Sequence, residues 1–269
     1  MDGEALDLEA YLRRIGLRER PSLALVHRAH VTAIPFENLD PHRGIPVSLE
    51  AEAIQRKLVA ARRGGYCFEH NLLLAAALRA LGAEVEPLLA RVRLGRPPGT
   101  PRPRTHLVLR VRSQGRLWLA DAGFGGGTLL EPIPFGPGVV HEQSGRRYRI
   151  VRDGAEHVLL RALGADFIEL YGFEPQAVPR IDIEVSNWFT CTHPRSPFVT
   201  GLDVAINRHD GSFQTLSDWG GRLTLSDERP GARFGESTVE PVRRRDLPRL
   251  LAARFGLDGF TVGPDGRLR

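Results

Sequence analysis

Apolar residues in the first part of the chain recur at the spacing of helices. In residues 8–15 they stand at i, i+3, i+4 and i+7, and Gly16 ends the pattern. Similar patterns, bounded by proline or by paired glycines, predict three further helices, over residues 21–34, 48–63 and 67–82. Ser48 is the predicted N-cap of the third of these four helices. Residues 34–39 are predicted to form a packed loop.

After residue 84 the pattern changes from the helical period to a period of two. Residues 106–112 and 116–121 are predicted to be paired strands, and residues 85–93 alternate in part. Three further short strands are predicted over residues 148–151, 157–160 and 181–185. These segments predict an antiparallel sheet or barrel.

The C-terminal part of the chain mixes both patterns. Hairpin-like segments follow Phe198, with Asp210-Gly211 as a turn, and a final helix is predicted over residues 244–255. The segment 94–103 is rich in Gly, Pro and Arg and has no period, which predicts a loop. The predicted order is a helical bundle, a β-domain and a mixed C-terminal segment.

Charge and composition narrow the class of protein. The chain has 269 residues and a formal net charge of +5, and Lys57 is its only lysine, so nearly all of its positive charge comes from arginine. The arginines are scattered and do not form a basic stripe with interleaved aromatic residues, which argues against nucleic-acid binding. A modest positive charge favours a small anionic ligand such as a phosphorylated cofactor.

Membrane insertion and secretion are not expected from this sequence. Its apolar runs are all shorter than the ~20 residues needed to span a bilayer, and its acidic N-terminal sequence lacks the features of a secretory signal. The protein is therefore expected in the cytoplasm, with Cys67 and Cys191 as reduced thiols. The histidines and cysteines show no HExxH or CxxC spacing, so no metal site is predicted.

The segment 62–69, with the sequence RRGGYCFE, carries the strongest chemical signal. It places Cys67 at the start of a predicted helix, directly after paired glycines. Backbone N–H groups and the positive end of the helix dipole favour a thiolate there, and the thiolate is the nucleophilic form. The alternative is a structural cysteine, because free cysteines are commonly buried.

A histidine and an aspartate on the predicted hairpin can assist this cysteine. If residues 114–115 form a two-residue loop, Ser113 pairs with Arg116. His106 and Asp121 then become diagonal neighbours on one face, ~7–8 Å apart at the backbone. A three-residue loop would put them on opposite faces. A carboxylate beside an imidazole fixes its tautomer and stabilises its charged form, as in catalytic triads.

Five segments together resemble the arylamine N-acetyltransferase family over nearly the full length of the chain. In order, they are residues 34–39 (IPFENL), 63–69 (RGGYCFE), 104–106 (RTH), 121–125 (DAGFG) and 187–198 (NWF…THP…SPF). Cys67, His106 and Asp121 each fall on a position of the family's catalytic triad.

The resemblance implies an α+β fold of several domains around a Cys-His-Asp core like that of cysteine proteases. A helical bundle carrying the nucleophile is expected over residues 1–83. An antiparallel β-barrel carrying the histidine and aspartate is expected over residues 84–190, and an α/β lid over residues 191–269.

The resemblance also implies an activity: acetyl transfer from acetyl-CoA to arylamines, arylhydroxylamines or hydrazines, through a thioester on Cys67. The expected coenzyme A contacts are Thr105, Gly125 and Phe198, and the expected acceptor contacts are Phe36, Phe124 and His70.

Some of these contact residues have structural alternatives. The N–H groups of the glycine cluster in 125–128 suit a pyrophosphate, but a flexible loop has the same composition. His70 can also be a polar cap on the first helical turn. Phe124 and Phe198 can also be plain core residues.

Three other functions remain open at this point. An enzyme of the same architecture can close a macrolactam by joining a polyketide acyl chain to an aryl amine. A Cys-His-Asp triad in this chain order also serves thiol proteases and transglutaminase-like hydrolases. A non-catalytic binding protein is disfavoured, because all three triad positions are intact. The sequence leaves open the acceptor, the acyl chain length, the oligomeric state and whether the role is detoxification or biosynthesis.

Overall fold

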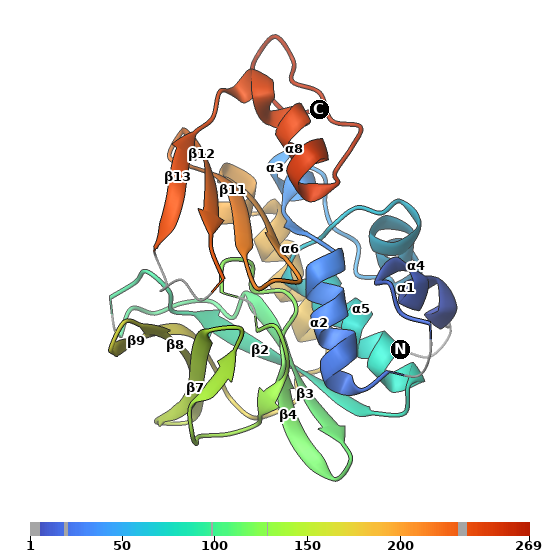
Figure 1. The fold of residues 1–269 in the computed structure, drawn as a ribbon, viewed down its shortest axis with the longest axis vertical. Helices are drawn as coiled ribbons and strands as arrows, with labels where there is room; N and C mark the ends of the chain where they lie inside the picture. The colour runs from blue at the N-terminus through green and yellow to red at the C-terminus, as the bar shows by residue number, and fades with distance from the viewer. Residues whose placement is uncertain (1–5, 19–20, 98, 128, 231–235) are drawn as a thin grey trace.

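The structure is a computed structural model that describes residues 6–18, 21–97, 99–127, 129–230 and 236–269 (Figure 1). Its helices are α1 (Leu8–Arg14), α2 (Leu23–Ala33), α3 (Leu39–His42), α4 (Ala51–Gln55), a π-helix (Arg56–Ala60), α5 (Cys67–Ala80), α6 (Arg180–Thr192), α7 (Pro197–Thr200), a 3₁₀ turn (Arg244–Asp246) and α8 (Leu247–Phe255). Its strands are β1 (Phe36–Glu37), β2 (Glu84–Val92), β3 (His106–Ser113), β4 (Arg116–Ala120), β5 (Ile133–Pro134), β6 (His141–Gln143), β7 (Arg146–Asp153), β8 (Glu156–Leu163), β9 (Asp166–Phe173), β10 (Leu202–Asn207), β11 (Phe213–Trp219), β12 (Arg222–Glu228) and β13 (Ser237–Pro241).

The four helices predicted for the N-terminal part are present. Asp7 caps α1 by accepting the backbone N–H of Ala10 at 2.9 Å, and Ser22 caps α2 in the same way. The prediction that Ser48 caps the third helix is wrong. The backbone is still extended at Glu50, so α4 begins one residue later, and the Ser48 hydroxyl accepts the N–H of Glu50 ahead of the helix.

The helical bundle packs on the outside of the barrel. Its apolar side chains form one hydrophobic cluster, which continues through Leu107, Leu109 and Val111 of β3. Val108 points the other way and belongs to the cluster inside the barrel. His106 shares the face of Val108, because side chains alternate along a strand.

Eight antiparallel strands form the nearly closed barrel, in the order β5-β4-β3-β2-β9-β8-β7-β6. The predicted strands at 85–93, 148–151 and 157–160 correspond to β2, β7 and β8, whereas β5, β6 and β9 had no counterpart in the prediction. The Gln143 side chain of β6 hydrogen-bonds the backbone of residues 130–131, just before β5. This side chain therefore joins the edge strand β6 to the segment that leads into the other edge strand, β5.

The β3–β4 hairpin has the predicted register. Ser113 pairs with Arg116, so the loop consists of Gln114 and Gly115. Both loop residues have positive φ, 51° and 73°. Positive φ at both positions is typical of a type I′ turn, whose twist suits a two-residue hairpin.

The strand predicted at residues 181–185 is wrong, because this segment lies in α6. Its alternating apolar residues misled the prediction: Ile181 and Val185 are both 60% exposed. The helix buries a mostly polar face at helical spacing, made of Ile183, Ser186, Asn187, Thr190 and Cys191. A pattern of apolar positions cannot reveal a buried face of this kind.

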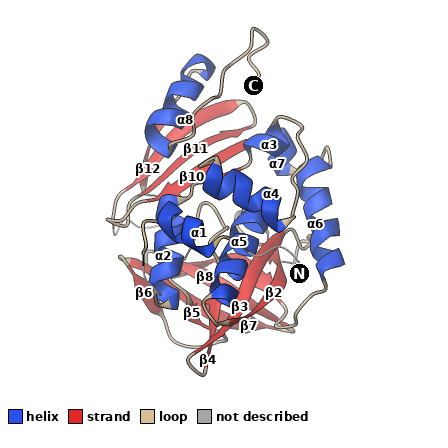
Figure 2. Cartoon of the chain, turned by 90° about the vertical axis from the view of Figure 1, so that its right-hand side faces the viewer, coloured by secondary structure: helices blue, strands red, loops and turns tan. Residues whose placement is uncertain are grey.

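The C-terminal unit combines α8 with a second sheet, in the order β1-β10-β11-β12-β13. Apolar residues of β10, β11, β12 and α8 form a third hydrophobic cluster, so α8 covers one face of this sheet (Figure 2). The predicted turn at Asp210-Gly211 is present, with a φ of 87° at Gly211. The predicted final helix corresponds to the 3₁₀ turn and α8.

Strand β1 joins this second sheet to the loop before Cys67. Phe36 pairs with Ala205 of β10 and forms an isolated bridge with Gly65. The prediction of residues 34–39 as a packed loop missed this strand, which is only two residues long.

A buried group of charged residues joins the barrel to the C-terminal sheet. Glu228 of β12 accepts a hydrogen bond of 2.6 Å from Arg161 of β8 and lies 3.4 Å from Arg146 of β7. Arg146 also donates to the Asn207 side chain of β10 at 2.7 Å. These side chains are all buried.

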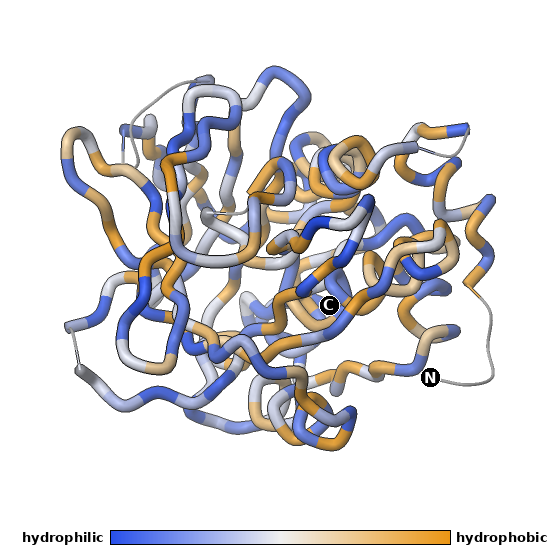
Figure 3. Tube along the Cα trace, turned by 90° about the horizontal axis from the view of Figure 1, so that it is seen from below, coloured by the Kyte–Doolittle hydropathy of each residue, from blue (hydrophilic) through white to orange (hydrophobic). Residues whose placement is uncertain are grey.

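The three hydrophobic clusters match the predicted fold class of helical bundle, β-barrel and α/β lid. The boundaries at 83/84 and 190/191 stay a prediction. Within the described ranges, no helix is both long and apolar enough to cross a membrane. Figure 3 shows hydrophobic and hydrophilic residues interspersed along the trace.

Candidate active site

Cys67 is the first residue of α5 and follows a tightly packed glycine loop. A Cβ on Gly64 would lie 2.1 Å from the carbonyl oxygen of Pro35, so only glycine fits there. A Cβ on Gly65 would lie 2.7 Å from Oε2 of Glu69. Close packing therefore requires both glycines, and the loop that they form delivers Cys67 to the start of the helix.

The Cys67 side chain lies where the bundle meets the barrel. It is 3% exposed, and like Cys191 it is a free thiol. Its sulfur lies 3.6 Å from the carbonyl oxygen of Thr105, and its side chain also contacts the imidazole of His106. The helical ladder of α5 begins where His70 donates to the carbonyl of Tyr66, so the N–H of Cys67 lies before the ladder.

His106 and Asp121 form a buried hydrogen-bonded pair. Nε2 of His106 lies 2.8 Å from Oδ2 of Asp121, and both residues are at most 2% exposed. Oδ1 of Asp121 accepts from the Asn71 side chain and from the N–H of Gly123, each at 2.9 Å. With Nε2 bound to Asp121, Nδ1 of His106 is the ring nitrogen left for Cys67.

The charges of this pair favour an imidazolium beside a carboxylate. Burial lowers the pKa of His106, but the charge of Asp121, its hydrogen bond and the contact with Cys67 outweigh burial and raise the pKa to about 10. Burial raises the pKa of Asp121, but His106, Asn71 and Gly123 outweigh it, so this pKa lies below its usual value.

A histidine of α2 holds the backbone of Asp121. Nε2 of His27 accepts the N–H of Asp121 at 3.1 Å, and Nδ1 of His27 lies 3.1 Å from the carbonyl oxygen of Leu130. The side chain of His27 is fully buried.

A cluster of five charged residues supports the loop that leads to Cys67: Lys57, Arg63, Glu37, Asp40 and Glu69. Nζ of Lys57 lies 2.7 Å from Asp40 and 2.8 Å from Glu69, and Arg63 lies 2.7 Å from Glu37. Burial lowers the pKa of Lys57, but the three carboxylates outweigh it and raise this pKa above its usual value. Glu69 also accepts the N–H of the residue before Cys67, at 3.1 Å.

Two aromatic rings enclose the imidazole of His106. The ring centroids of Phe124 and Tyr171 lie 5.2 and 4.9 Å from that of His106, and 5.1 Å from each other. Phe124 is half-buried, so the imidazole is bordered by one ring that is partly open to solvent.

Three other predicted contact residues meet at the ring of Phe36. The ring centroid of Phe36 lies 6.0 Å from that of Phe198, and a Cβ on Gly125 would lie 3.4 Å from the nearest ring carbon atoms of Phe36. Gly125 has a φ of 69°, which favours glycine. The prediction for Thr128, at the end of the glycine cluster, lies outside the described residues.

His70 lies behind Phe36 and is 1% exposed. Its Nε2 donates to the Pro35 carbonyl at 3.1 Å, and its Nδ1 accepts from Nε2 of His30 at 2.8 Å. Burial lowers the pKa of His70 to about 4. Both ring nitrogens are thus used inside the protein, so these contacts support neither a direct acceptor contact nor a helix cap. The ring instead stacks on Phe36, at an interplanar angle of 12°.

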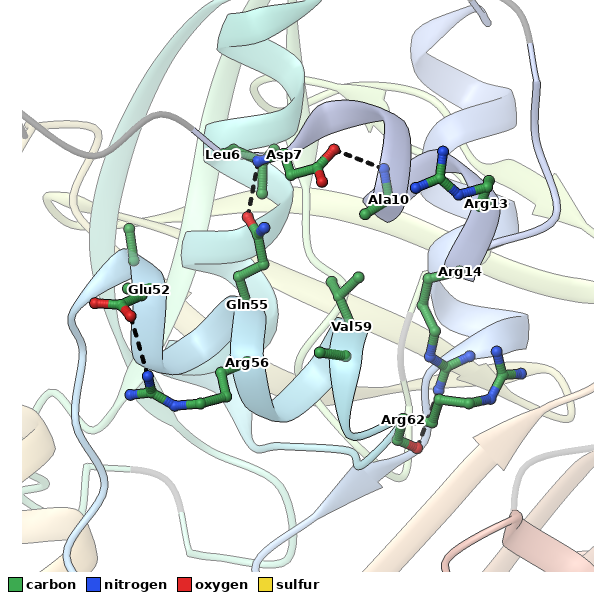
Figure 4. Close-up of a pocket in the computed structure, with 12 residues that line it drawn as sticks. Leu6, Asp7, Ala10, Arg13, Arg14, Glu52, Gln55, Arg56, Val59 and Arg62 are labelled. Atoms are coloured by element: carbon green, nitrogen blue, oxygen red, sulfur yellow. Dashed lines mark hydrogen bonds and ion pairs between the residues drawn. The ribbon is translucent and has the colours of Figure 1, made fainter.

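A cavity of about 770 Å³ lies at another place, between α1 and the segment of α4 and the π-helix (Figure 4). Asp7, Arg13 and Arg56 are among its lining residues, and in the described part of the chain its lining includes no predicted site residue. Across the described ranges, no group of three or more His, Cys, Asp or Glu residues is arranged to hold a metal ion. The expectation of a metal-free site stays a prediction.

The sequence reading missed two residues that hold Asp121. Asn71 lies four residues after Cys67, and this spacing puts both residues on one side of a helix. The sequence therefore contains a signal that could have placed Asn71 near the active site. His27 lies 94 positions before Asp121. Its only local signal is helical spacing, which does not distinguish it from a core residue.

Comparison with known proteins identifies the family. A family described as N-acetyltransferase matches residues 21–259. A protein of Mycolicibacterium smegmatis named arylamine N-acetyltransferase is 44% identical over an alignment of 278 positions, which covers 98% of this chain and 97% of that protein. A protein of Salmonella typhimurium named arylamine N-acetyltransferase / N-hydroxyarylamine O-acetyltransferase is 34% identical, and the alignment covers 93% and 88%.

Solved structures agree with the sequence relatives. The structure of the Mycobacterium marinum arylamine N-acetyltransferase in complex with CoA matches with a TM-score of 0.86 and 38% identity, over 93% of each chain. With the family match, these likenesses extend over nearly the whole chain, so it belongs to the arylamine N-acetyltransferase family.

Proposed function

We propose that this protein transfers an acetyl group from acetyl-CoA to arylamines, arylhydroxylamines or hydrazines, through a thioester on Cys67. The observation that carries the proposal is the 2.8 Å contact of His106 with Asp121 beside Cys67, in a chain of this family. The relatives support the substrate classes, because one was solved in complex with CoA and another is named for both arylamines and N-hydroxyarylamines.

In the first half-reaction, the Cys67 thiolate attacks the carbonyl carbon of the acetyl thioester. The bond from this carbon to the sulfur of coenzyme A breaks, and coenzyme A leaves with the proton of the His106 imidazolium. Backbone N–H groups, that of Cys67 among them, hold the oxyanion of the intermediate. Loss of one such donor typically costs about 10²–10³ in rate.

In the second half-reaction, the amine attacks the acetylated Cys67. Cys67 then carries no charge, so one of the contacts that raise the pKa of His106 is lost. The neutral imidazole accepts the proton of the amine, the carbon–sulfur bond breaks, and Cys67 returns to a thiolate beside imidazolium. Asp121 keeps the imidazole in one tautomer and stabilises its charged form.

The remaining contact residues belong to the same proposal. Coenzyme A is assigned to Thr105, Gly125 and Phe198, and the acceptor to Phe36 and Phe124. The proximity of Phe36, Phe198 and Gly125 supports these assignments, as does the 5.2 Å between the rings of Phe124 and His106. A cytoplasmic location, and the expectation of no metal, nucleic-acid or membrane partner, come from the sequence alone.

Intact-protein mass spectrometry tests the proposal directly. Brief exposure to acetyl-CoA without an amine should add one acetyl group, at Cys67, and Cys67→Ala should remain folded without gaining it. An arylamine should then remove the group. Initial rates with both substrates varied should give parallel double-reciprocal lines, because coenzyme A leaves before the amine reacts.

Each other function gives a different result in these measurements. A macrolactam-forming enzyme would acylate poorly with acetyl-CoA but readily with a bulky acyl thioester. A hydrolase would consume acetyl-CoA equally fast with and without the amine. Intersecting lines together with an unmodified Cys67 would overturn the proposed mechanism.

A further inference from the structure

The imidazole of His27 makes two hydrogen bonds that together fix its protonation. A backbone N–H can only donate, so Nε2, which bonds the N–H of Asp121, must be an unprotonated acceptor. A carbonyl can only accept, so Nδ1, which bonds the oxygen of Leu130, must carry the hydrogen. His27 is therefore neutral and in a single tautomer.

The two partners of His27 are the ends of one loop. The loop 121–130, of which the structure describes residues 121–127 and 129–130, follows β4, which ends at Ala120, and precedes β5, which begins at Ile133. The loop begins with the carboxylate that bonds His106, and it continues with Phe124 and Gly125. One buried side chain from α2 thus closes the base of the loop that carries Asp121.

This loop also packs against the nucleophile. A Cβ on Gly123 would lie 2.5 Å from Cα of Cys67, so the backbones of the loop and of the α5 start are in close contact. The ring of Phe124 meets the imidazole of His106. A shift at the base of the loop therefore reaches both Cys67 and His106.

We propose that His27 is a positioning residue for acetyl transfer: it holds the Asp121 backbone and the loop 121–130 where Asp121 can orient His106. Oδ1 of the Asp121 carboxylate is held by the Asn71 side chain and by the N–H of Gly123, which belongs to the same loop. Without His27, the buried N–H of Asp121 would lose its acceptor, and because an unpaired buried donor is unfavourable, the backbone would move to regain one. The inference rests on the proposed function of Asp121.

The surroundings of His27 agree with a neutral ring. Burial lowers the pKa of His27, although the carbonyl of Leu130 and the charge of Asp121 act in the opposite direction. Protonation would add a hydrogen to Nε2, facing the N–H of Asp121, and would break that bond.

The test compares His27→Leu with His27→Gln in protein that carries ¹⁵N-labelled histidine. A glutamine amide offers both an acceptor and a donor, whereas leucine offers neither. We expect His27→Leu to lower the pH at which His106 titrates by NMR. It should also slow the acetylation of Cys67, followed by rapid-quench mass spectrometry, about 10- to 100-fold. His27→Gln should retain most of both properties.

His30→Leu is the matched control. It also removes a buried imidazole from α2, but the ring of His30 bonds Tyr11 and His70. Loss of the His30 ring should not change the pH at which His106 titrates. An equal shift of that titration in His30→Leu would mean general loosening of the core, and would overturn the proposal.

Two further NMR measurements distinguish the role of His27 from the proposed acetyl transfer. In the native protein, the ¹⁵N shifts of His27 should show the neutral Nδ1–H form at pH 7, and any other form would overturn the proposal even if the variants failed to fold. The titration of His106 needs no acetyl-CoA. A native protein that never acetylates Cys67 would therefore refute only the proposed function. If the native protein acetylates Cys67 but His106 titrates at the same pH in His27→Leu as in the native protein, only this inference is refuted.

Discussion

At Asp121 the two carboxylate oxygens have separate tasks. Oδ1 accepts the N–H groups of Asn71 and Gly123, which leaves Oδ2 for His106. An asparagine can keep the first set of bonds through its amide oxygen. Its amide nitrogen would then face Nε2 of His106 as a donor, so the imidazole would be forced into the wrong tautomer.

Asp121→Asn should therefore lower the rate of acetyl transfer about 10⁴-fold, as the same exchange does in serine protease triads. Single-turnover acetylation of Cys67 measures the effect. An unchanged circular dichroism spectrum must accompany the loss, to exclude unfolding. Activity near the native level would mean that the carboxylate has a structural role only.

The raised pKa of His106 predicts a pH dependence with a definite sign. The folded protein binds this proton more tightly than the unfolded chain, because the pKa rises from 6.5 to about 10. The resulting stabilisation is complete below pH 6.5 and is lost as the pH rises to about 10. Urea unfolding across this range should show a larger loss of stability in the native protein than in His106→Gln.

The same group can be observed directly by NMR. The ¹⁵N signal of His106 should titrate near pH 10, and at a lower pH in Cys67→Ala, because the contact with Cys67 contributes to the shift. A signal that titrates near 6.5 in the native protein would contradict the ion pair with Asp121.

At the scale of elements, local patterns predicted the part of the site that depends on one hairpin. The loop Gln114-Gly115 fixes the register of β3 and β4, and this register brings His106 to Asp121. Contacts between elements that are distant in the sequence could not be predicted from such local patterns. His27 and Asp121 belong to different units of the chain, and only the folded arrangement brings them together.

Buried polar side chains also made the secondary structure of α6 hard to predict from the sequence. In α6 the buried side chains include Ser186 and Asn187, and the exposed ones include Ile181. The polar side chains are buried because they bond other parts of the protein: Asn187 donates to the carbonyl of Val47 at 3.0 Å. Hydrophobic periodicity cannot predict such a helix, because its packing is specified by hydrogen bonds.

The contact between the loop 121–130 and the start of α5 gives an element-scale prediction. Gly123→Ala should reduce acetylation of Cys67 by at least about 10-fold, because its Cβ would lie 2.5 Å from Cα of Cys67. Gly126→Ala is a matched control in the same loop, since the space around its Cβ is open to 4 Å. Equal activity of the two variants would show that the loop backbone can move to accommodate the added methyl group without disturbing the site.

At the scale of the whole molecule, the three units meet around the site through polar contacts as well as apolar ones. The bundle supplies Cys67, and the barrel supplies His106. The lid reaches the same region through β10, whose Ala205 pairs with Phe36. The buried Glu228 ties the lid to two barrel strands.

Glu228→Ala should lower the free energy of unfolding by about 3–5 kcal/mol, because it leaves Arg146 and Arg161 buried without their carboxylate. Chemical denaturation measures this change. Glu240→Ala, at an exposed position of the neighbouring strand β13, should change stability by no more than about 0.5 kcal/mol. A similarly small effect of Glu228→Ala would mean that the buried carboxylate does not stabilise the contact between the two units.

The burial of Lys57 has a consequence for the surface chemistry of the protein. Lys57 is the only lysine, its side chain is 16% exposed, and its ammonium group is held among three carboxylates. An amine must be deprotonated to take up an acetyl group, and here the charged form is strongly favoured. The arginines that carry the remaining positive charge stay protonated and are poor nucleophiles. The protein therefore offers activated acetyl groups almost no side-chain amine of its own, so little acetyl-CoA should be lost to N-acetylation of its side chains.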